Sequence, residues 1–412
     1  MSNLKNQKET THKMKRILLL GGTPIQIPII EKAHEMGLYV ITCDNKPDNP
    51  GHKLADEYHD ISITDNEAVL RLAESLHVDA VVNFILEAGV QAAAYVHEKL
   101  GKPTSPYESV HILSNKKLFR TYLKEHGFCT PDLFTCSNKK EAYEKIGTLK
   151  YPVVVKPTDL WGSRGVSRVD KPEDFEDALD LAFSNSRGAD IIVEEFIESD
   201  GAPVEGDAFA VDGTLATHVW TDVYSDPMAE NPITPVCFCY PSAKPLHLLK
   251  KLDHELQRLI TLLGMKTNGY NVEARIDRDG KVYLMEVAPR SGGNDFPTIL
   301  SLSTGNDIER ATLLAALGED NMEIKDAACQ GFWIGYIVHS NVAGTYQGMW
   351  YSAEFENKYL YRFTQYISNG DDVCPYSGTN CSIGLLIARF DTRKEMEEVA
   401  QNPTRFFRPI IK

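Results

Sequence analysis

The stretch YNVEARIDRDGKVYLMEVAPR, residues 270–290, carries the most structural information in this chain. Asp279-Gly280 divides it into two strands, because this dipeptide is a preferred two-residue turn of a β-hairpin. With that turn, Glu273 faces Glu286 on the neighbouring strand, with Cβ atoms about 5 Å apart. Two opposed carboxylates repel each other, so the pattern predicts a compensating positive charge.

A divalent cation with oxygen ligands is the natural source of that charge, since Mg²⁺ binds between carboxylates and phosphates with few protein ligands. The alternative is a solvated hairpin with two exposed glutamates. The apolar run VYLMEVA around Glu286 disfavours that alternative. Asn271 falls opposite Ala288 on the same face. Arg290 follows the second strand, where its guanidinium could reach phosphate oxygens.

The N-terminal part alternates short apolar runs with helical patterns. The runs at 16–21, 38–44 and 78–84 predict strands, which indicates a parallel, doubly wound sheet over roughly the first hundred residues. Ligands bind beyond the carboxyl ends of such strands. Glu87 is expected at that edge.

Composition excludes several classes of protein. The 412 residues are 42% apolar and carry a net charge of -15, which argues against nucleic acid or an anionic membrane as main partner. No apolar run reaches the ~18 residues of a membrane span. The eight cysteines contain no C-x-x-C pair. Residues 1–15 are polar and are expected to form a flexible extension, and the protein is expected to be cytoplasmic.

The order of five motifs resembles the ATP-grasp superfamily, in the branch that holds biotin carboxylase, carbamoyl phosphate synthetase and purine-pathway enzymes. The motifs are NKKLFR, PVVVKP, LWGSRGV, IIVEEFIE and EVAPR. The resemblance implies an α/β chain whose ATP-grasp part is α+β. It also implies a Rossmann-like domain over 16–113, an ATP-grasp domain over 114–318 with a lid at about 129–190, and a small α+β domain over 319–412.

The same resemblance assigns roles to individual residues. ATP would contact Lys116, Lys156, Ser163, Arg164, Gly165, Glu194, Glu195, Ile197 and Glu205. Glu205 is the expected ribose ligand, with Asp200 as the alternative, and Glu194 is the expected partner of the adenine amine. Mg²⁺ or Mn²⁺ would bind Glu273 and Glu286, with Asn271 as a replacement for the asparagine that often stands at position 288. Arg290 would act in catalysis, and Glu87 and Asn294 would contact substrate.

The implied activity is a carboxylate-amine ligase that forms an acyl phosphate from ATP, on a small carboxylate such as an amino acid. The partners are then small molecules, and the resemblance allows a homodimer. One alternative is a purine-pathway or carboxylase-type enzyme that uses formate or bicarbonate. Ser377–Phe390 has no basic residue before Arg389, which disfavours a ribonucleotide substrate. Another alternative is a non-catalytic ATP-binding regulatory protein.

Overall fold

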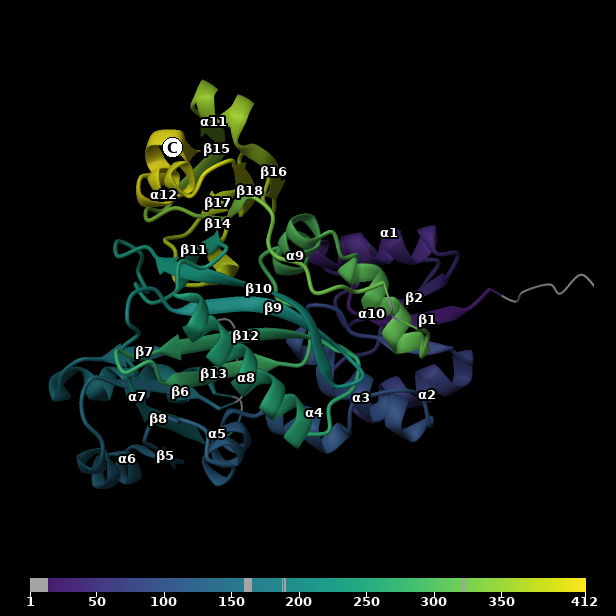
Figure 1. The fold of residues 1–412 in the computed structure, drawn as a ribbon, viewed down its shortest axis with the longest axis horizontal. Helices are drawn as coiled ribbons and strands as arrows, with labels where there is room; N and C mark the ends of the chain where they lie inside the picture. Colours follow the sequence, from purple (N-terminus) through teal and green to yellow (C-terminus); the bar gives the residue numbers. More distant parts are fainter. Residues whose placement is uncertain (1–13, 159–164, 187, 189, 321–322) are drawn as a thin grey trace, which may run out of the picture.

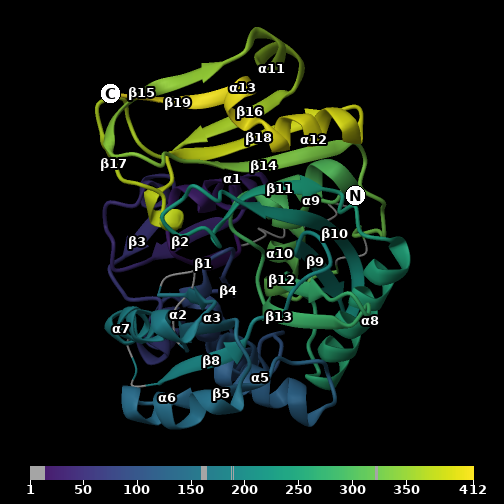
Figure 2. The ribbon, with the colours of Figure 1, turned by 90° about the vertical axis from the view of Figure 1, so that its left-hand side faces the viewer.

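The computed structural model describes residues 14–158, 165–186, 188, 190–320 and 323–412. Figures 1 and 2 show three main parts: a parallel sheet, a smaller antiparallel sheet, and a core sheet that runs into the C-terminal part. No helix within the described residues is both long and apolar enough to cross a membrane.

The N-terminal sheet is parallel, with the strand order β3-β2-β1-β4. Successive residues of β1 enter different cores: Ile17 and Leu19 pack with α1 and α10, whereas Leu18 and Leu20 pack with α2 and α3. Burial of both faces explains why the strands are apolar throughout. The elements are β1 (Arg16–Leu20), α1 (Ile27–Glu35), β2 (Tyr39–Cys43), β3 (Glu57–His59), α2 (Asn66–Leu76), β4 (Ala80–Val82), α3 (Val90–Lys99) and α10 (Ile308–Leu317).

The segment expected to form the lid contains an antiparallel sheet with the strand order β5-β8-β6-β7, and we keep the name lid for it. Two helices precede it, α4 (Tyr107–Ser114) and α5 (Lys116–Glu125). Its own elements are β5 (Leu133–Cys136), α6 (Lys139–Lys145), β6 (Val153–Pro157), β7 (Ser167–Val169), α7 (Phe175–Asn185) and β8 (Ile191–Glu195).

The core sheet has eight strands in the order β13-β12-β9-β10-β11-β14-β18-β16. Helices α8 (Leu246–Leu262) and α9 (Phe296–Thr304) pack on it. Its strands are β9 (Val204–Val211), β10 (Thr214–Ser225), β11 (Pro235–Tyr240), β12 (Asn268–Ile276), β13 (Val282–Ala288), β14 (Phe332–Val338), β16 (Leu360–Gln365) and β18 (Gly384–Phe390). Three of these strands come from residues 319–412, so the sheet extends across the domain boundary expected at 318/319.

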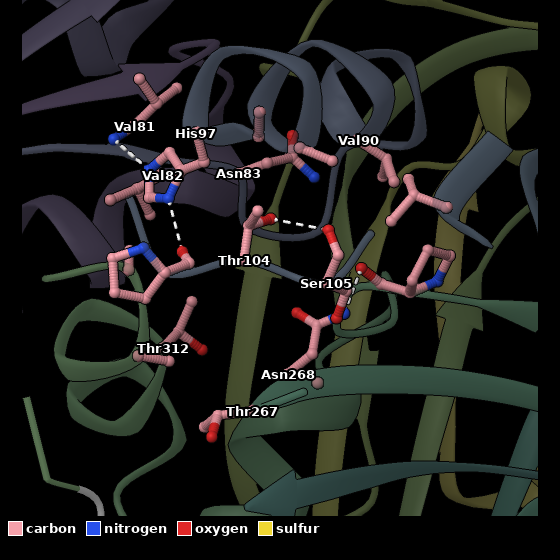
Figure 3. A pocket seen from close by; sticks show the side chains of 18 of the residues that line it. Val81, Val82, Asn83, Val90, His97, Thr104, Ser105, Thr267, Asn268 and Thr312 are labelled. Carbon is pink, nitrogen blue, oxygen red and sulfur yellow. Dashed lines mark hydrogen bonds between the residues drawn. The ribbon is translucent and has the colours of Figure 1, made fainter. Parts of the chain in front are cut away.

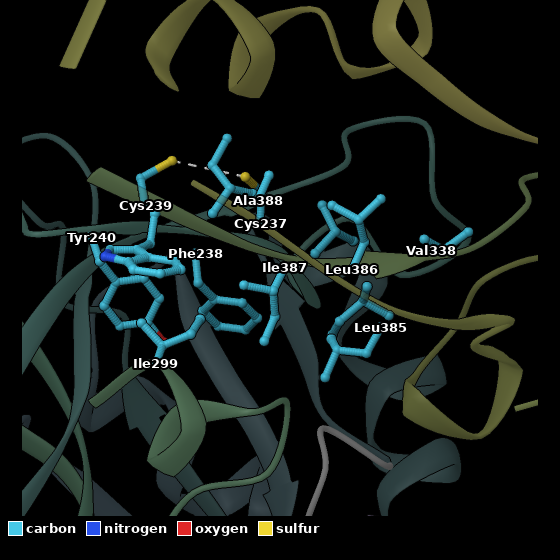
Figure 4. Close-up of a cluster of buried hydrophobic side chains, with 14 of the residues drawn as sticks. Cys237, Phe238, Cys239, Tyr240, Ile299, Val338, Leu385, Leu386, Ile387 and Ala388 are labelled. Atoms are coloured by element: carbon cyan, nitrogen blue, oxygen red, sulfur yellow. Dashed lines mark hydrogen bonds between the residues drawn. The ribbon is translucent and has the colours of Figure 1, made fainter. Parts of the chain in front are cut away.

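A continuous apolar cluster explains this continuity. Phe238 and Tyr240 of β11, Ile299 of α9 and Ile387 of β18 are each at most 1% exposed and pack together (Figure 4). The rest of the C-terminal part forms a small sheet, β17-β15-β19, beside three helices. These elements are β15 (Gly344–Tyr351), α11 (Ala353–Lys358), β17 (Asp372–Val373), α12 (Arg393–Gln401), α13 (Pro403–Phe406) and β19 (Phe407–Ile411).

A cavity of about 90 Å³ lies where the parallel sheet meets the core sheet (Figure 3). His97 fixes one wall, because its Nδ1–H donates to Pro103 O at 2.7 Å and its Nε2 accepts from Val81 N–H at 2.8 Å. Burial lowers the pKa of His97, so the neutral ring that these two bonds require is favoured. These contacts anchor the segment that joins the two sheets.

Candidate active site

The hairpin β12–β13 places Glu273 opposite Glu286 and Asn271 opposite Ala288, as expected. The turn itself differs from the expectation. Gly280 has a positive φ of +70° but Asp279 does not, so the prediction of a two-residue turn is wrong. Asp277 N–H donates to Lys281 O at 3.1 Å, which closes a loop of three residues.

A β-bulge restores the predicted pairing. The register shifts by one residue after Glu273, and Met285 has no partner on β12. This extra residue compensates for the longer turn, so the two glutamates still face each other. The carbonyl of Met285 accepts a hydrogen bond from Arg120 Nη1 at 2.9 Å. The bulge therefore also creates a contact for helix α5.

The opposed pair is part of a row of three glutamates on β9, β12 and β13, which we call the acidic row: Glu205, Glu273 and Glu286. Glu205 pairs with Glu273 in the sheet register, so both side chains share a face. We expected Glu205 to bind ribose; the structure places it beside the carboxylate pair, and the ribose contact stays a prediction. Burial and the neighbouring carboxylates raise the pKa of Glu205 well above its usual range. Desolvation within the site and the neighbouring Glu286 raise the pKa of Glu273 to about 7, although the side chain still reaches solvent.

Two lysines approach this row from different elements. Lys116, at the start of α5, has its Nζ 3.8 Å from Glu286 Oε2. Lys156, on β6 of the lid, bonds to Glu194. Burial alone would raise the pKa of Glu286, but Lys116, Arg290 and Lys156 outweigh it and lower that pKa. Lys116 thus stands against the acidic row, and Lys156 faces it from the lid.

Arg120 and Lys156 balance the negative charge of Glu194. Its side chain is 1% exposed, and its Oε2 lies 3.0 Å from Arg120 Nε. Burial would raise its pKa, but Arg120 and Lys156 lower it to about 2. We expected Glu194 to meet the adenine amine; any such contact would be additional to these two ion pairs.

The hinge that follows β8 is held by backbone contacts. Glu195 N–H donates to Asp132 O at 2.9 Å, and Ile197 O accepts from Arg275 Nη1 at 2.9 Å. Gly165 has a φ of +69°, and a Cβ there would lie 3.0 Å from Pro157 Cγ. Ser163 and Arg164 lie outside the described residues.

Arg290 and Glu87, predicted to meet different ligands, form an ion pair with Nε and Oε2 2.7 Å apart. Their side chains are 11% and 8% exposed. Glu87 stands after β4 of the parallel sheet, and Arg290 follows β13 of the core sheet. The pair therefore joins the edge of the N-terminal sheet to the hairpin. A substrate ammonium group would have to share Glu87 with Arg290.

Asp207 clamps the turn that follows Arg290. Both its carboxylate oxygens lie 2.9 Å from Gly292 N, and its Oδ1 accepts from Asn271 Nδ2 at 3.0 Å. Asp207 is 2% exposed, and burial raises its pKa to about 7. A Cβ at Gly292 would lie 2.6 Å from Asn271 Nδ2, so only glycine fits. The clamp fixes both Arg290's turn and the Asn271 amide.

The turn ends in a polar contact with the C-terminal strands. Asn294 and Asp295 have φ of +55° and +60°, a conformation that costs non-glycine residues about 1–2 kcal/mol each. Arg362 of β16 places Nη2 2.7 Å from Asp295 Oδ2. Asp295 Oδ2 and Arg362 Nε are nevertheless buried without a hydrogen-bond partner. This ion pair is poorly aligned, and both groups retain bonding capacity.

The donors fit a Mg²⁺ that is shared with phosphate. Within the described ranges, no group of three or more histidine, cysteine, aspartate or glutamate side chains is arranged to hold a metal ion. Glu273 and Glu286 supply two hard oxygen ligands, and the remaining positions would go to phosphate oxygens and water. The amide nitrogen of Asn271 donates to Asp207. The carbonyl oxygen of Asn271 could then act as a third ligand.

Sequence reasoning missed Arg120, Asp207 and Arg362. Arg120 lies one turn after Lys116, so both share a helix face, and this spacing could have paired them. Asp207 lies two residues after Glu205, on the same face of a strand. Arg362 has no local signal, because its partner Asp295 is distant in the sequence.

The chain is similar to known proteins in sequence and in fold. Residues 149–298 match the ATP-grasp domain family. The chain is 26% identical to the formate-dependent phosphoribosylglycinamide formyltransferase of Bacteroides thetaiotaomicron, over 95% of this chain and 98% of that protein.

Two crystal structures share the fold. An L-amino acid ligase from Bacillus licheniformis has a TM-score of 0.82 and 21% identity, covering 98% of this chain and 100% of that one. A phosphoribosylglycinamide synthetase from Anaerococcus prevotii has a TM-score of 0.76 and 21% identity, covering 97% and 100%. The domain match and the full-length similarities agree: this chain contains an ATP-grasp domain at residues 149–298 and is similar over its length to ATP-dependent ligases.

Proposed function

We propose that the protein is a Mg²⁺- and ATP-dependent carboxylate-amine ligase that works through an acyl phosphate. The observation that carries this proposal is the meeting of Glu273 and Glu286 with Lys116 and Arg290 on one face of the hairpin. Lys156 faces them from the lid. A protein that only senses ATP would not require this complete set.

The reaction has two steps. A substrate carboxylate oxygen attacks the γ-phosphorus of ATP, the bond to the β-phosphate oxygen breaks, and ADP leaves. An amine nitrogen then attacks the acyl carbon, phosphate leaves, and the nitrogen gives up a proton. Phosphoryl transfer between anions requires charge neutralisation and alignment more than covalent help.

The chain's own residues supply both requirements. Lys116, Lys156 and Arg290 would neutralise phosphate oxygens, while Glu194 and Glu87 hold two of these cations in place. Mg²⁺ on Glu273 and Glu286 would add positive charge at the β- and γ-phosphates. Asp207 keeps the Arg290 turn from moving, because it binds Gly292 N–H.

The amine-bearing substrate is proposed to be small and only weakly anionic, such as an amino acid. Arg362 is the basic side chain that the C-terminal strands bring against the turn at Asn294, and Asp295 already balances its charge. Arg389 and Arg408 pack over Trp333 and Trp350 instead. At the other end of the turn, Glu87 would bind the ammonium group of such a substrate while it also holds Arg290.

Glycinamide ribonucleotide and aminoimidazole ribonucleotide should therefore not support turnover at useful rates. A ribose phosphate carries nearly two charges, and desolvating it beside one neutralised arginine costs several kcal/mol. The assay follows ADP with each ribonucleotide and formate or bicarbonate, against amino acids offered in pairs. The full-length similarity to the formyltransferase favours the purine-pathway alternative. ADP release with either ribonucleotide would establish that alternative and exclude ours.

A further inference from the structure

A second groove lies on the side of the hairpin away from the acidic row. It encloses about 440 Å³, between the first turns of α8 and the loop of the hairpin. Five of its lining side chains can carry positive charge: His247, Lys250, Lys251, His254 and Lys281. The first four follow one another at helical spacing, so a single stripe of α8 forms one wall.

The positive charge in this groove is not balanced by the protein. Within the described part of the chain, no nitrogen of these five side chains lies within 4.0 Å of a carboxylate oxygen. Lys251 only donates to Gly280 O, at 3.1 Å. Glu255, which also lines the groove, pairs with Arg258 at 3.2 Å. Some lysines elsewhere on the surface do have carboxylate partners, as Lys139 and Lys32 show.

Such a concentration of charge is unexpected on a chain with a net charge of -15. The net charge repels nucleic acid, whereas a local basic groove still attracts a small anion. A volume of 440 Å³ lies within the range of about 300–1,000 Å³ that is usual for small-molecule sites. Several ammonium groups on one surface suit adjacent phosphates, which accept several charged hydrogen bonds.

We propose that this groove is a second anion site, for a small molecule with two or more adjacent phosphate groups. It is separate from the ATP site, because Val282 and Leu284 turn toward α8 while Glu286 lies on the other face of β13. The groove also contacts the segment that leads into the lid. In that segment, Cys129 forms an isolated β-bridge with Tyr283 of β13. A bound anion would contact α8, the hairpin and this segment together.

The test is a calorimetric titration of inorganic pyrophosphate into the full chain with the ATP site saturated by a non-hydrolysable ATP analogue. The double variant Lys250→Gln with Lys281→Gln removes two groove charges at exposed positions. Its control, Lys140→Gln with Lys394→Gln, removes the same charge from α6 and α12, outside the groove. A parallel titration uses citrate, which carries its charges on carboxylates.

We expect wild-type protein and the control to bind pyrophosphate with the same affinity, within about twofold. The groove variant should bind at least about tenfold more weakly, since it lacks two charged hydrogen-bond donors to the phosphates. Absence of binding beside the ATP analogue would overturn the proposal, and so would an equal loss in both variants. Tighter binding of citrate would overturn the assignment to phosphate. Ligase activity is assayed separately, so neither result depends on the other.

Discussion

The substitution Glu286→Gln is expected to abolish ATP turnover while the protein stays folded. Glu286 is one half of the opposed carboxylate pair and lies 3.8 Å from Lys116. The amide keeps the shape of the side chain but removes the charge that would bind Mg²⁺. Loss of a contact that stabilises charge in the transition state costs about 10²–10³ in kcat. Steady-state ADP release at saturating Mg²⁺ and ATP measures the loss.

The melting temperature provides the control for this variant. Glu273 and Glu286 repel each other only when both are ionised, and the pKa of Glu273 is raised to about 7. Glu286→Gln also loses the attraction of Lys116, Arg290 and Lys156, so the relief of repulsion at pH 8 is an advantage that offsets part of the resulting fall in the melting temperature measured without metal. At pH 5 Glu273 keeps its proton, so this advantage should disappear. Normal turnover in the variant would remove the metal assignment.

The second large effect is expected from Gly292→Ala. The new methyl group would lie 2.6 Å from Asn271 Nδ2 and 2.7 Å from Asp207 Oδ1, two nearly buried groups that cannot retreat. The turn must then move and carry Arg290 with it. Overpacking of this kind costs about 1–3 kcal/mol, and a displacement of ~1 Å at a catalytic group can cost about a hundredfold in rate. We expect kcat to fall by that order, with a smaller change in the KM for ATP.

Gly293 offers a matched control one residue further on. A Cβ at Gly293 would meet no atom within 4 Å, so Gly293→Ala should keep nearly wild-type kcat at saturating substrate. Both variants add one methyl group to the same turn, and only the first disturbs the Asp207 clamp. Equal losses of kcat in the two variants would contradict the clamp.

The sequence predicted those parts of the site that depend on local pairing. The parallel sheet followed from apolar runs that the structure buries on both faces, as in β1. The pairing of Glu273 with Glu286 was also correct, although the turn is longer than predicted and the bulge at Met285 compensates for it. Neither deviation has a sequence signal as clear as Asp-Gly.

Contacts between distant segments could not be predicted in the same way. The place of Glu205 in the acidic row depends on the pairing of β9 with β12, which the sequence around Glu205 does not indicate. The pair of Arg290 with Glu87 joins two sheets, and Arg362 meets Asp295 across two separate segments. Nothing in one segment indicates which residue of the other it will meet.

Trapping with hydroxylamine is the most direct test for the formation of an acyl phosphate from ATP. Hydroxylamine attacks an acyl phosphate to give a hydroxamate, without any need to know the natural amine. The protein is incubated with Mg²⁺, ATP, hydroxylamine and each of a panel of amino acids and other small carboxylates, and the products are identified by mass spectrometry. We expect a hydroxamate of one acid together with equimolar ADP and phosphate from wild-type protein, and none of these products from Glu286→Gln. Release of AMP and pyrophosphate with the hydroxamate would contradict the formation of an acyl phosphate, because the acid would then have been activated as an adenylate.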